Sequence, residues 1–229
     1  MTHPALSRSV EDYLKAIFAL SRSGDPVATS AIAESLTIQP ASVTGMVKRM
    51  AEWGLLEHVP YKGVRLTEPG EREALRVIRR HRILETYLCD RLGFTWDDVH
   101  DEAERLEHAA SDELIERMAQ ALGSPSHDPH GAPIPTVGGL IELEDLETLA
   151  DAEPGAHVVV RSVRDQSAPD LRSMAEGGLV PGARLRVDDV GPDGSVVITV
   201  EGGPTGGDPV PTALARHVFV APDEAVSRE

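Results

Sequence analysis

The hydrophobic periodicity of this chain changes once, at a segment rich in glycine and proline, and that change is the strongest constraint on its fold. Before residue 123, apolar residues recur every three or four positions, which is typical of amphipathic helices. The segment 123–139, GSPSHDPHGAPIPTVGG, cannot sustain a regular element and predicts a connecting loop. Four to five short β runs bounded by Gly and Pro follow, which predicts a small barrel of about 75 residues. We therefore expect a mainly α chain with a small β domain.

The first 72 residues have the pattern of a winged helix-turn-helix. One helix is expected in SVEDYLKAIFALSRSG, capped by Ser9 and stopped by Gly24, and two shorter helices at 30–36 and 40–52. The stretch LLEHVPYKGVRLTEPG then alternates as two strands around a turn, with Thr67 as the cap of the next helix. Helices followed by a two-stranded ribbon indicate this DNA-binding fold.

The helical pattern continues from Glu71 to Leu122 with an interruption at 93–97. We expect three domains: residues 1–72, a helical domain over 73–148 that includes the connecting loop 123–140, and a β domain over 149–229. The β runs GAHVVVRSV, GARLRVDDV, GSVVITVEG and RHVFVAP belong to this last domain.

Composition places the chain among cytoplasmic proteins. No run approaches the roughly 18 apolar residues of a membrane span, and the first residues lack the apolar stretch of a secretory signal. The single cysteine, Cys89, excludes an internal disulfide and a cysteine-rich zinc site. A metal in this chain would therefore have to be held by carboxylates and imidazoles.

The net charge of −16 is unevenly distributed. Residues 1–70 contain seven basic and seven acidic residues, whereas 31 acidic and 15 basic residues follow. A neutral N-terminal segment with clustered cations, followed by an acidic remainder, favours a DNA-binding domain joined to a carboxylate-rich sensor domain.

The second helix of the helix-turn-helix is expected to enter the major groove of double-stranded DNA. Polar and small side chains near its start suit base edges, and nearby cations suit phosphates. The candidate DNA contacts are Gln39, Pro40, Ala41, Ser42, Thr44, Lys48, Arg49, Lys62 and Arg65. Two alternatives stay open: a winged helix used for protein contact, and Arg49 as a structural ion-pair partner.

The stretch VHDEAERLEH places acids and imidazoles on one stripe if it is written as a helix. His100, Glu104, Glu107 and His108 then stand at i, i+4, i+7 and i+8. Such a stripe is either a solvated helix face or a set of metal ligands. Two observations favour metal: His81 and Glu85 form a second i, i+4 pair, and Asp12 lies between apolar residues where an unpaired carboxylate is costly.

The order of VEDYLKAI, QPASVTGMVKRMAEWGLL, YKGVRLTEPG, RRHRILE, VHDEAERLEHAASDEL and DPHGAPIP resembles the diphtheria toxin repressor family of iron- and manganese-dependent transcriptional regulators. The resemblance spans nearly the whole chain, with an SH3-like domain in the place of the expected β-barrel. It implies a homodimeric, metal-activated repressor of metal-uptake and homeostasis genes that binds a palindromic operator. It implies no membrane and no small organic substrate.

The resemblance also implies two metal sites per subunit. Asp12, Glu104, Glu107 and His108 match the primary site, and His81, Glu85 and His100 match the ancillary one. The third domain of some members adds ligands to the ancillary site, for which this chain offers Asp165 or Asp170. The helix containing Tyr87 and Leu88, and the helix after Glu107, match the dimer interface.

Departures within the family bear on the metal. Iron-responsive members commonly have methionine and cysteine where this chain has Asp12 and Glu104, and harder oxygen ligands move a site towards Mn²⁺. Manganese is therefore the first expectation, with Fe²⁺ as the alternative. Lys15 stands where two-domain manganese regulators place a second glutamate, which together with His100 favours two separated sites.

Two rival classes differ from a metal-activated repressor in what the metal does. A metallohydrolase would need an open coordination position beside a substrate pocket, and the sequence offers no obvious oxyanion hole or nucleophile. A storage or trafficking protein would bind metal without any effect on DNA binding. We therefore expect that the protein is not an enzyme. In the expected mechanism, metal binding joins Asp12 to the dimer core and narrows the range of orientations of the winged domain.

Overall fold

The computed structural model describes residues 6–21, 25–142, 144–164, 167–203 and 209–225. They form two compact units. The first unit takes in the chain as far as His81, with Arg105–Ile115 and Pro135–Ile141. The second takes in Arg82–Glu104, Glu116–Ile134 and the chain from Glu142 onward.

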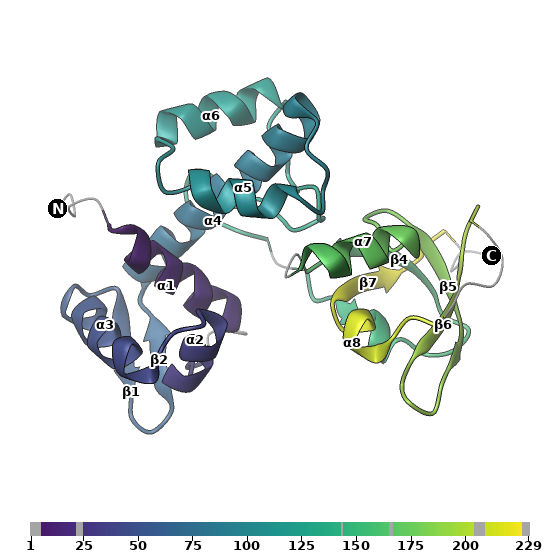
Figure 1. Ribbon diagram of the computed structural model, residues 1–229, viewed down its shortest axis with the longest axis horizontal. Helices are drawn as coiled ribbons and strands as arrows, with labels where there is room; N and C mark the ends of the chain where they lie inside the picture. Colours follow the sequence, from purple (N-terminus) through teal and green to yellow (C-terminus); the bar gives the residue numbers. More distant parts are fainter. Residues whose placement is uncertain (1–5, 22–24, 143, 165–166, 204–208, 226–229) are drawn as a thin grey trace. The chain divides into compact units, whose positions relative to one another are not determined.

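The first unit contains the predicted winged helix-turn-helix (Figure 1). Its elements are α1 (Arg8–Leu20), α2 (Thr29–Ser35), α3 (Pro40–Glu52), β1 (Leu56–Val59), β2 (Gly63–Leu66) and the first part of α4 (Glu68–Leu92). The cap of α1 is Ser7 rather than Ser9, which lies inside the helix, and the predicted stop at Gly24 lies outside the described residues.

The core of this unit joins the first three helices. Val10, Leu14 and Ile17 of α1 are buried in one cluster with the apolar face of α3, which is formed by Val43, Val47 and Met50. The helix α3 ends at Glu52; Gly54, two residues later, has a φ of +73° that suits glycine, and Leu55 N–H donates to Met50 O. The helices α1 and α3 are therefore packed against each other through one shared core.

The wing is an antiparallel hairpin of β1 and β2 with Leu56 opposite Leu66. Val27 adds a bridge to Val64. Gly63 is required here, because a Cβ atom at its position would lie 2.0 Å from the carbonyl oxygen of Val27. Thr67 caps α4 as predicted: its Oγ1 accepts a hydrogen bond from Gly70 N–H at 3.2 Å.

The middle of the chain is helical, with α5 (Val99–Leu106) and α6 (Asp112–Ala121) following α4. The predicted stripe on one helix is wrong in one respect, because α5 ends at Leu106 and leaves Glu107 and His108 in the following turn. Ser111 caps the start of α6, because its Oγ accepts a hydrogen bond from Leu114 N–H. No helix in the described part of the chain is both long and apolar enough to span a bilayer.

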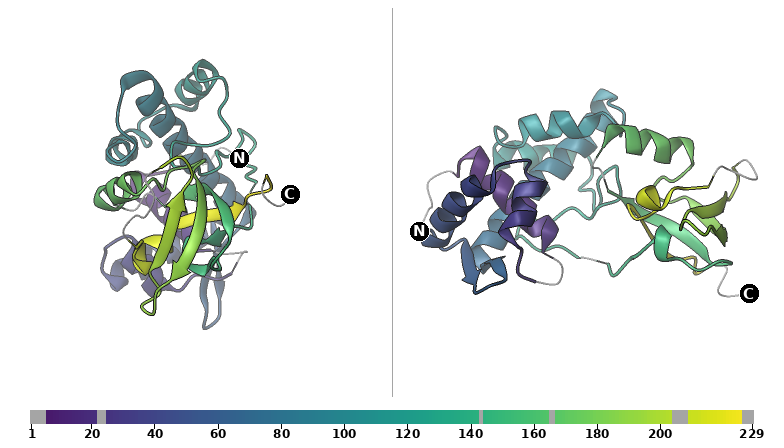
Figure 2. Two further views of the ribbon diagram at one scale, coloured as in Figure 1. Left: turned by 90° about the vertical axis from the view of Figure 1, so that its right-hand side faces the viewer. Right: turned by 60° about the horizontal axis from the view of Figure 1, so that its bottom comes forward.

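The second unit contains the predicted small β domain (Figure 2). Its strands are β3 (Glu147–Thr148), β4 (His157–Val163), β5 (Arg184–Val190), β6 (Val196–Val200) and β7 (Val218–Pro222). They form one antiparallel sheet in the order β3-β7-β4-β5-β6. Three short helical elements that the sequence did not reveal interrupt them: η1 (Leu149–Asp151), α7 (Ala168–Glu176) and α8 (Thr212–Ala215). Met174 and Leu171 of α7 complete the core.

Candidate metal centres and nucleic-acid interface

The exposed face of α3 presents the polar residues predicted to read DNA. Gln39 is the N-cap residue of α3 and Pro40 its first residue. All the predicted residues on this helix are exposed: Gln39, Pro40, Ala41, Ser42, Thr44, Lys48 and Arg49. The opposite face is buried in the core, so the helix offers only this side to a groove.

Three of the residues predicted to contact phosphates differ in their exposure and in their partners within the chain. Lys62 is exposed in the turn of the wing, whereas Arg65 is half-buried and pairs with Glu57 at 3.1 Å. Arg49 donates to Met46 Sδ at 3.4 Å, and none of the ion pairs among the described residues involves it. The exposed Arg49 is therefore not the structural ion-pair partner that the sequence left open as an alternative.

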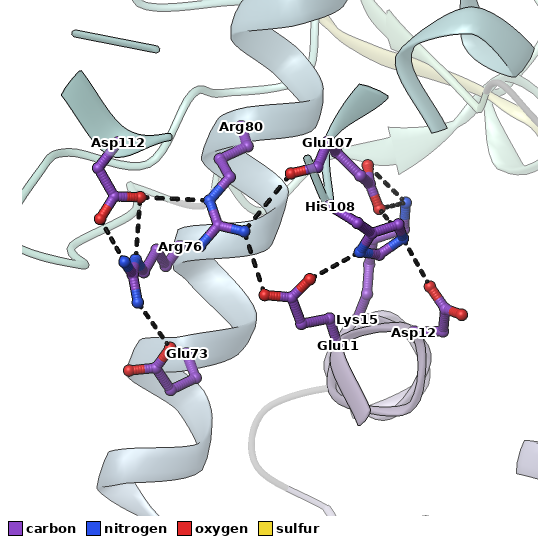
Figure 3. A network of polar contacts seen from close by, with 9 residues as sticks. All are labelled: Glu11, Asp12, Lys15, Glu73, Arg76, Arg80, Glu107, His108 and Asp112. Carbon is purple, nitrogen blue, oxygen red and sulfur yellow. Dashed lines mark hydrogen bonds and ion pairs between the residues drawn. The ribbon is translucent and has the colours of Figure 1, made fainter. Parts of the chain in front are cut away.

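Three predicted primary ligands come together in the first unit, from two separate segments. Asp12 lies on α1, and Glu107 and His108 lie in the turn after α5. One ligand atom of each lies within 4.8 Å of the others. His108 Nε2 is 3.0 Å from Asp12 Oδ1 and 3.4 Å from Glu107 Oε1. Figure 3 shows these three labelled side chains close together. Such spacings suit ligands around one ion with bonds of about 2.1 Å.

His108 is oriented by Glu11, a residue that sequence reasoning missed. Nδ1 of His108 lies 2.6 Å from Glu11 Oε2, so this nitrogen carries the proton and Nε2 is directed at Asp12. Glu11 is buried and receives Arg80 Nη1 at 3.1 Å (Figure 3). A carboxylate behind a histidine is the usual outer partner of a metal ligand. The signal in the sequence was a second acid next to Asp12.

Glu107 is fully buried and still ionised. Lys15 Nζ lies 2.9 Å from its Oε1, and His81 Nδ1 lies 2.6 Å from its Oε2. Burial acts to raise the pKa of Glu107, but the hydrogen bond from His81 and the charge of Lys15 outweigh it and lower that pKa. The carboxylate is thus available as an anionic ligand near neutral pH.

Glu104, the fourth predicted primary ligand, lies on α5, three residues before Glu107. It is half-buried. The donor set of carboxylates and one imidazole is hard and suits Mn²⁺ or Fe²⁺ better than it suits copper(I). The buried Glu107 carboxylate and the tautomer of His108 fit a divalent cation at this place.

Glu85 is the centre of a second group, in the second unit. It is fully buried on α4, and its Oε1 lies 3.2 Å from Nδ1 of His100 on α5. Two predicted ancillary ligands are therefore in contact. The third, His81, is one turn earlier on α4, and its Nδ1 is directed at Glu107.

The connecting loop adds two residues to Glu85 that sequence reasoning passed over. Asp128 and His130 are buried, and one ligand atom of each lies within 4.8 Å of Glu85 and of the other. His130 Nε2 donates to the carbonyl oxygen of Trp96 at 2.7 Å, which leaves Nδ1 facing Glu85 Oε2 at 3.7 Å. The available signal was the pattern DPHG inside the loop.

The turn at Asp128 explains why this loop is ordered. Asp128 Oδ1 accepts from His130 N–H and Ala132 N–H, both at 2.9 Å. Burial, followed by the charge of Glu85, raises the pKa of Asp128 to about 6. A cation bound between the two carboxylates would relieve this repulsion.

The two ligand candidates from the third domain differ in whether the structure describes them. Asp165 lies outside the described residues. Asp170 lies in the first turn of α7, where its N–H donates to Ser167 Oγ at 3.4 Å. Among the described residues, the groups that could hold a metal do not include Asp170.

Three family models match successive parts of the chain. Residues 5–64 match the N-terminal DNA binding domain of the iron dependent repressor, and residues 67–136 match its metal binding and dimerisation domain. Residues 147–222 match the FeoA domain.

Relatives and solved structures agree with these matches. The chain is 34% identical over 209 residues to the iron-dependent repressor IdeR of Mycobacterium tuberculosis, covering 85% of this chain and 89% of that protein. It is 31% identical over 204 residues to the diphtheria toxin repressor of Corynebacterium glutamicum, with the same coverage.

Among solved structures, a manganese-dependent transcriptional repressor in complex with manganese has a TM-score of 0.86 and 35% identity. That match covers 93% of this chain and all of the other. ScaR with bound Zn²⁺ has a TM-score of 0.80 and 29% identity, covering 93% and 99%. The chain belongs to the diphtheria toxin repressor and IdeR family, whose members are metal-dependent, DNA-binding transcriptional repressors and not enzymes.

Proposed function

We propose that this repressor responds to Mn²⁺, with Fe²⁺ as the alternative, through a primary site formed by Asp12, Glu104, Glu107 and His108. The observation that carries the proposal is the meeting of Asp12 with Glu107 and His108 within 4.8 Å. Glu104 stands one helical turn before Glu107 and would add a second hard oxygen from the same segment. A bound ion would supply a cross-link between α1 and that segment.

The chain's own residues carry the signal from this site to DNA. Asp12 lies on α1, and α1 shares its core with α3, the helix that would read the bases. Fixing Asp12 therefore fixes the orientation of α3. The exposed residues of α3, with Lys62 and Arg65 of the wing, would contact a palindromic operator from two subunits.

A second site would centre on Glu85, with two sites in each subunit. His100 contacts Oε1 of Glu85, His130 faces Oε2, and one ligand atom of Asp128 lies within 4.8 Å of those of Glu85 and His130. His81 and either Asp165 or Asp170 are the remaining candidate ligands. The order of loop Asp128–Ala132 supports this place, since its backbone holds the Asp128 carboxylate.

Three domains would divide this work: residues 1–72 read DNA, 73–148 bind metal and dimerise, and 149–229 form the SH3-like domain. Leu106 and Leu114 are large apolar residues exposed by 37% and 44%. Exposed apolar side chains in a segment matched to a dimerisation domain support burial against a second copy.

The experiment that tests the function is fluorescence anisotropy of the purified protein on promoter DNA. Mn²⁺, anaerobic Fe²⁺ and Zn²⁺ are titrated separately, and Asp12→Ala serves as the control. We expect tight binding to appear only with Mn²⁺ or Fe²⁺ and to be lost in the variant. DNA binding that is independent of metal would refute the proposal, and the ion that is more potent at its cellular concentration would identify the metal.

A further inference from the structure

Lys15 stands within the primary group as a fixed cation. Its Nζ lies 2.9 Å from Oε1 and 3.1 Å from Oε2 of Glu107, so that it contacts both oxygens of this ligand (Figure 3). The Lys15 side chain is only 23% exposed and the Glu107 side chain is 0% exposed. The pair is therefore poorly screened by water.

We propose that Lys15 is an affinity-determining residue of the primary metal site. Its ammonium group shares the Glu107 carboxylate with the bound metal ion and holds the affinity of the site for divalent cations below the value that the acidic ligands alone would give. This inference rests on the proposed primary site.

The contacts of Glu107 show why the two cations compete. Oε1 of Glu107 faces Nε2 of His108 at 3.4 Å, and that nitrogen faces Asp12. Oε1 is therefore the Glu107 oxygen directed towards the other ligands. Lys15 contacts this same oxygen, so that its positive charge lies close to any ion that the three ligands hold. Like charges that share one carboxylate in a partly buried site repel each other.

Lys15 repels the metal ion in the metal-bound protein, but it stabilises the metal-free protein by pairing with Glu107. A fully buried carboxylate is costly unless it is paired, and Lys15 provides a full positive charge at hydrogen-bond distance. Removing that charge raises the free energy of the metal-free state more than that of the metal-bound state, where the ion itself compensates Glu107. Both effects tighten metal binding when Lys15 is neutralised.

A purely structural role for Lys15 makes a different prediction. If Lys15 only held Glu107 in the orientation that a metal needs, its removal would weaken binding or leave it unchanged. The sign of the change in Mn²⁺ affinity therefore separates the two roles.

The test measures Mn²⁺ binding to the full chain by isothermal titration calorimetry, with electron paramagnetic resonance to count free Mn²⁺. Lys15→Met should bind Mn²⁺ about tenfold more tightly than the wild type, the change that ~1.4 kcal/mol produces. Lys15→Arg keeps the charge and should bind as the wild type does. Arg8→Met removes a cation from an exposed position of the same helix and is the matched control.

Thermal unfolding provides a second readout. Lys15→Met should have a lower Tm than the wild type without metal, and a larger rise of Tm when Mn²⁺ is added. Lys15→Gln keeps a hydrogen-bond donor without the charge and carries the same expectations if Lys15→Met does not fold.

Unchanged or weaker Mn²⁺ binding in Lys15→Met or Lys15→Gln would overturn the inference. Asp12→Ala distinguishes this failure from a failure of the primary site itself. If Asp12→Ala weakens Mn²⁺ binding while the Lys15 variants do not tighten it, only the role of Lys15 is wrong. If Asp12→Ala leaves Mn²⁺ binding intact, the proposed site is wrong as well.

Discussion

Two buried charged residues, Arg80 and Glu11, orient the proposed ligand His108. Arg80 donates to Glu11 at 3.1 Å and to the carbonyl oxygen of Glu107 at 3.4 Å, and its Nε reaches Asp112 at 3.3 Å (Figure 3). Arg80 and Glu11 are each less than a tenth exposed. This arrangement fixes Glu11, and Glu11 fixes the ring of His108.

Replacing Glu11 by alanine should weaken Mn²⁺ binding by about 10- to 100-fold, because His108 loses the acceptor that orients it. Glu11→Gln keeps an acceptor for Nδ1 and should lose less. Calorimetric titration with Mn²⁺ measures both variants. Glu68→Ala removes an exposed acid whose ion pair is with Arg72, and it should bind as the wild type does. Equal affinity in Glu11→Ala and Glu68→Ala would contradict the role of Glu11.

Asp128 should make the metal-free protein less stable as the pH rises. Its folded pKa of about 6 exceeds the ordinary value of 3.8, so the folded state binds the proton more tightly than the unfolded chain does. Its contribution to stability is therefore fully present below about pH 3.8 and is lost by about pH 6. Asp128→Asn removes this titration.

The Tm of Asp128→Asn minus that of the wild type, both without metal, should accordingly rise between pH 4 and pH 7. Each kcal/mol corresponds to about 2–4 °C in a chain of this size. The comparison uses the pH dependence because the substitution also alters the ion pair with Arg82. A difference in Tm that stays constant over this range would contradict the pKa.

At the scale of elements, the sequence predicted those parts whose signal is local. The bounds of α3 at Pro40–Glu52 and the cap at Thr67 follow from periodicity and capping residues, and the structure confirms both. The end of α5 was missed because Glu107 keeps the helical spacing while its side chain is held by Lys15 and His81, which are distant in the sequence.

The loop 123–139 shows the same limit. Its composition predicts irregular backbone, and the structure has no regular element there. Composition does not reveal that Asp128 organises a turn, or that His130 stacks on Trp96 with ring centroids 5.6 Å apart. His130 was therefore passed over, although it lies with Glu85.

The wing should be sensitive to substitution at Gly63 and much less so at Gly54. A Cβ at Gly63 would lie 2.0 Å from Val27 O, whereas none of the described atoms lies within 4 Å of one at Gly54. Gly63→Ala should lower the free energy of unfolding by at least ~3 kcal/mol, because backbone must move. Gly54→Ala should lower it by about 1 kcal/mol, the strain of a positive φ. Urea unfolding compares them, and equal losses would contradict the close approach.

The wing should also contribute charge to DNA binding. Lys62 is exposed in the turn between β1 and β2. If it contacts a phosphate, Lys62→Met should reduce the slope of log K against log salt by about 1. Anisotropy at several salt concentrations measures the slope, and Arg72→Met, an exposed cation paired with Glu68, is the control. An unchanged slope in Lys62→Met would show that Lys62 of the wing does not contact a DNA phosphate.

At the scale of the whole molecule, the proposed mechanism gives one helix, α1, the role of linking the metal site to the DNA-reading helix. The buried face of α1 packs with α3, while Asp12, on the same helix, meets the turn that carries Glu107 and His108. Any ion that gathers these ligands also selects an orientation of α3. Coupling between two ligands through one element is reciprocal, so DNA must favour metal binding by the factor by which metal favours DNA binding.

The most direct test of this coupling measures the Kd for Mn²⁺ with and without saturating operator DNA, and the Kd for DNA with and without saturating Mn²⁺. We expect the two ratios to be equal and well above one, and to fall to about one in Asp12→Ala. A Kd for Mn²⁺ that is the same with and without DNA would contradict the account, because α1 would then not connect the metal site to the DNA-reading helix.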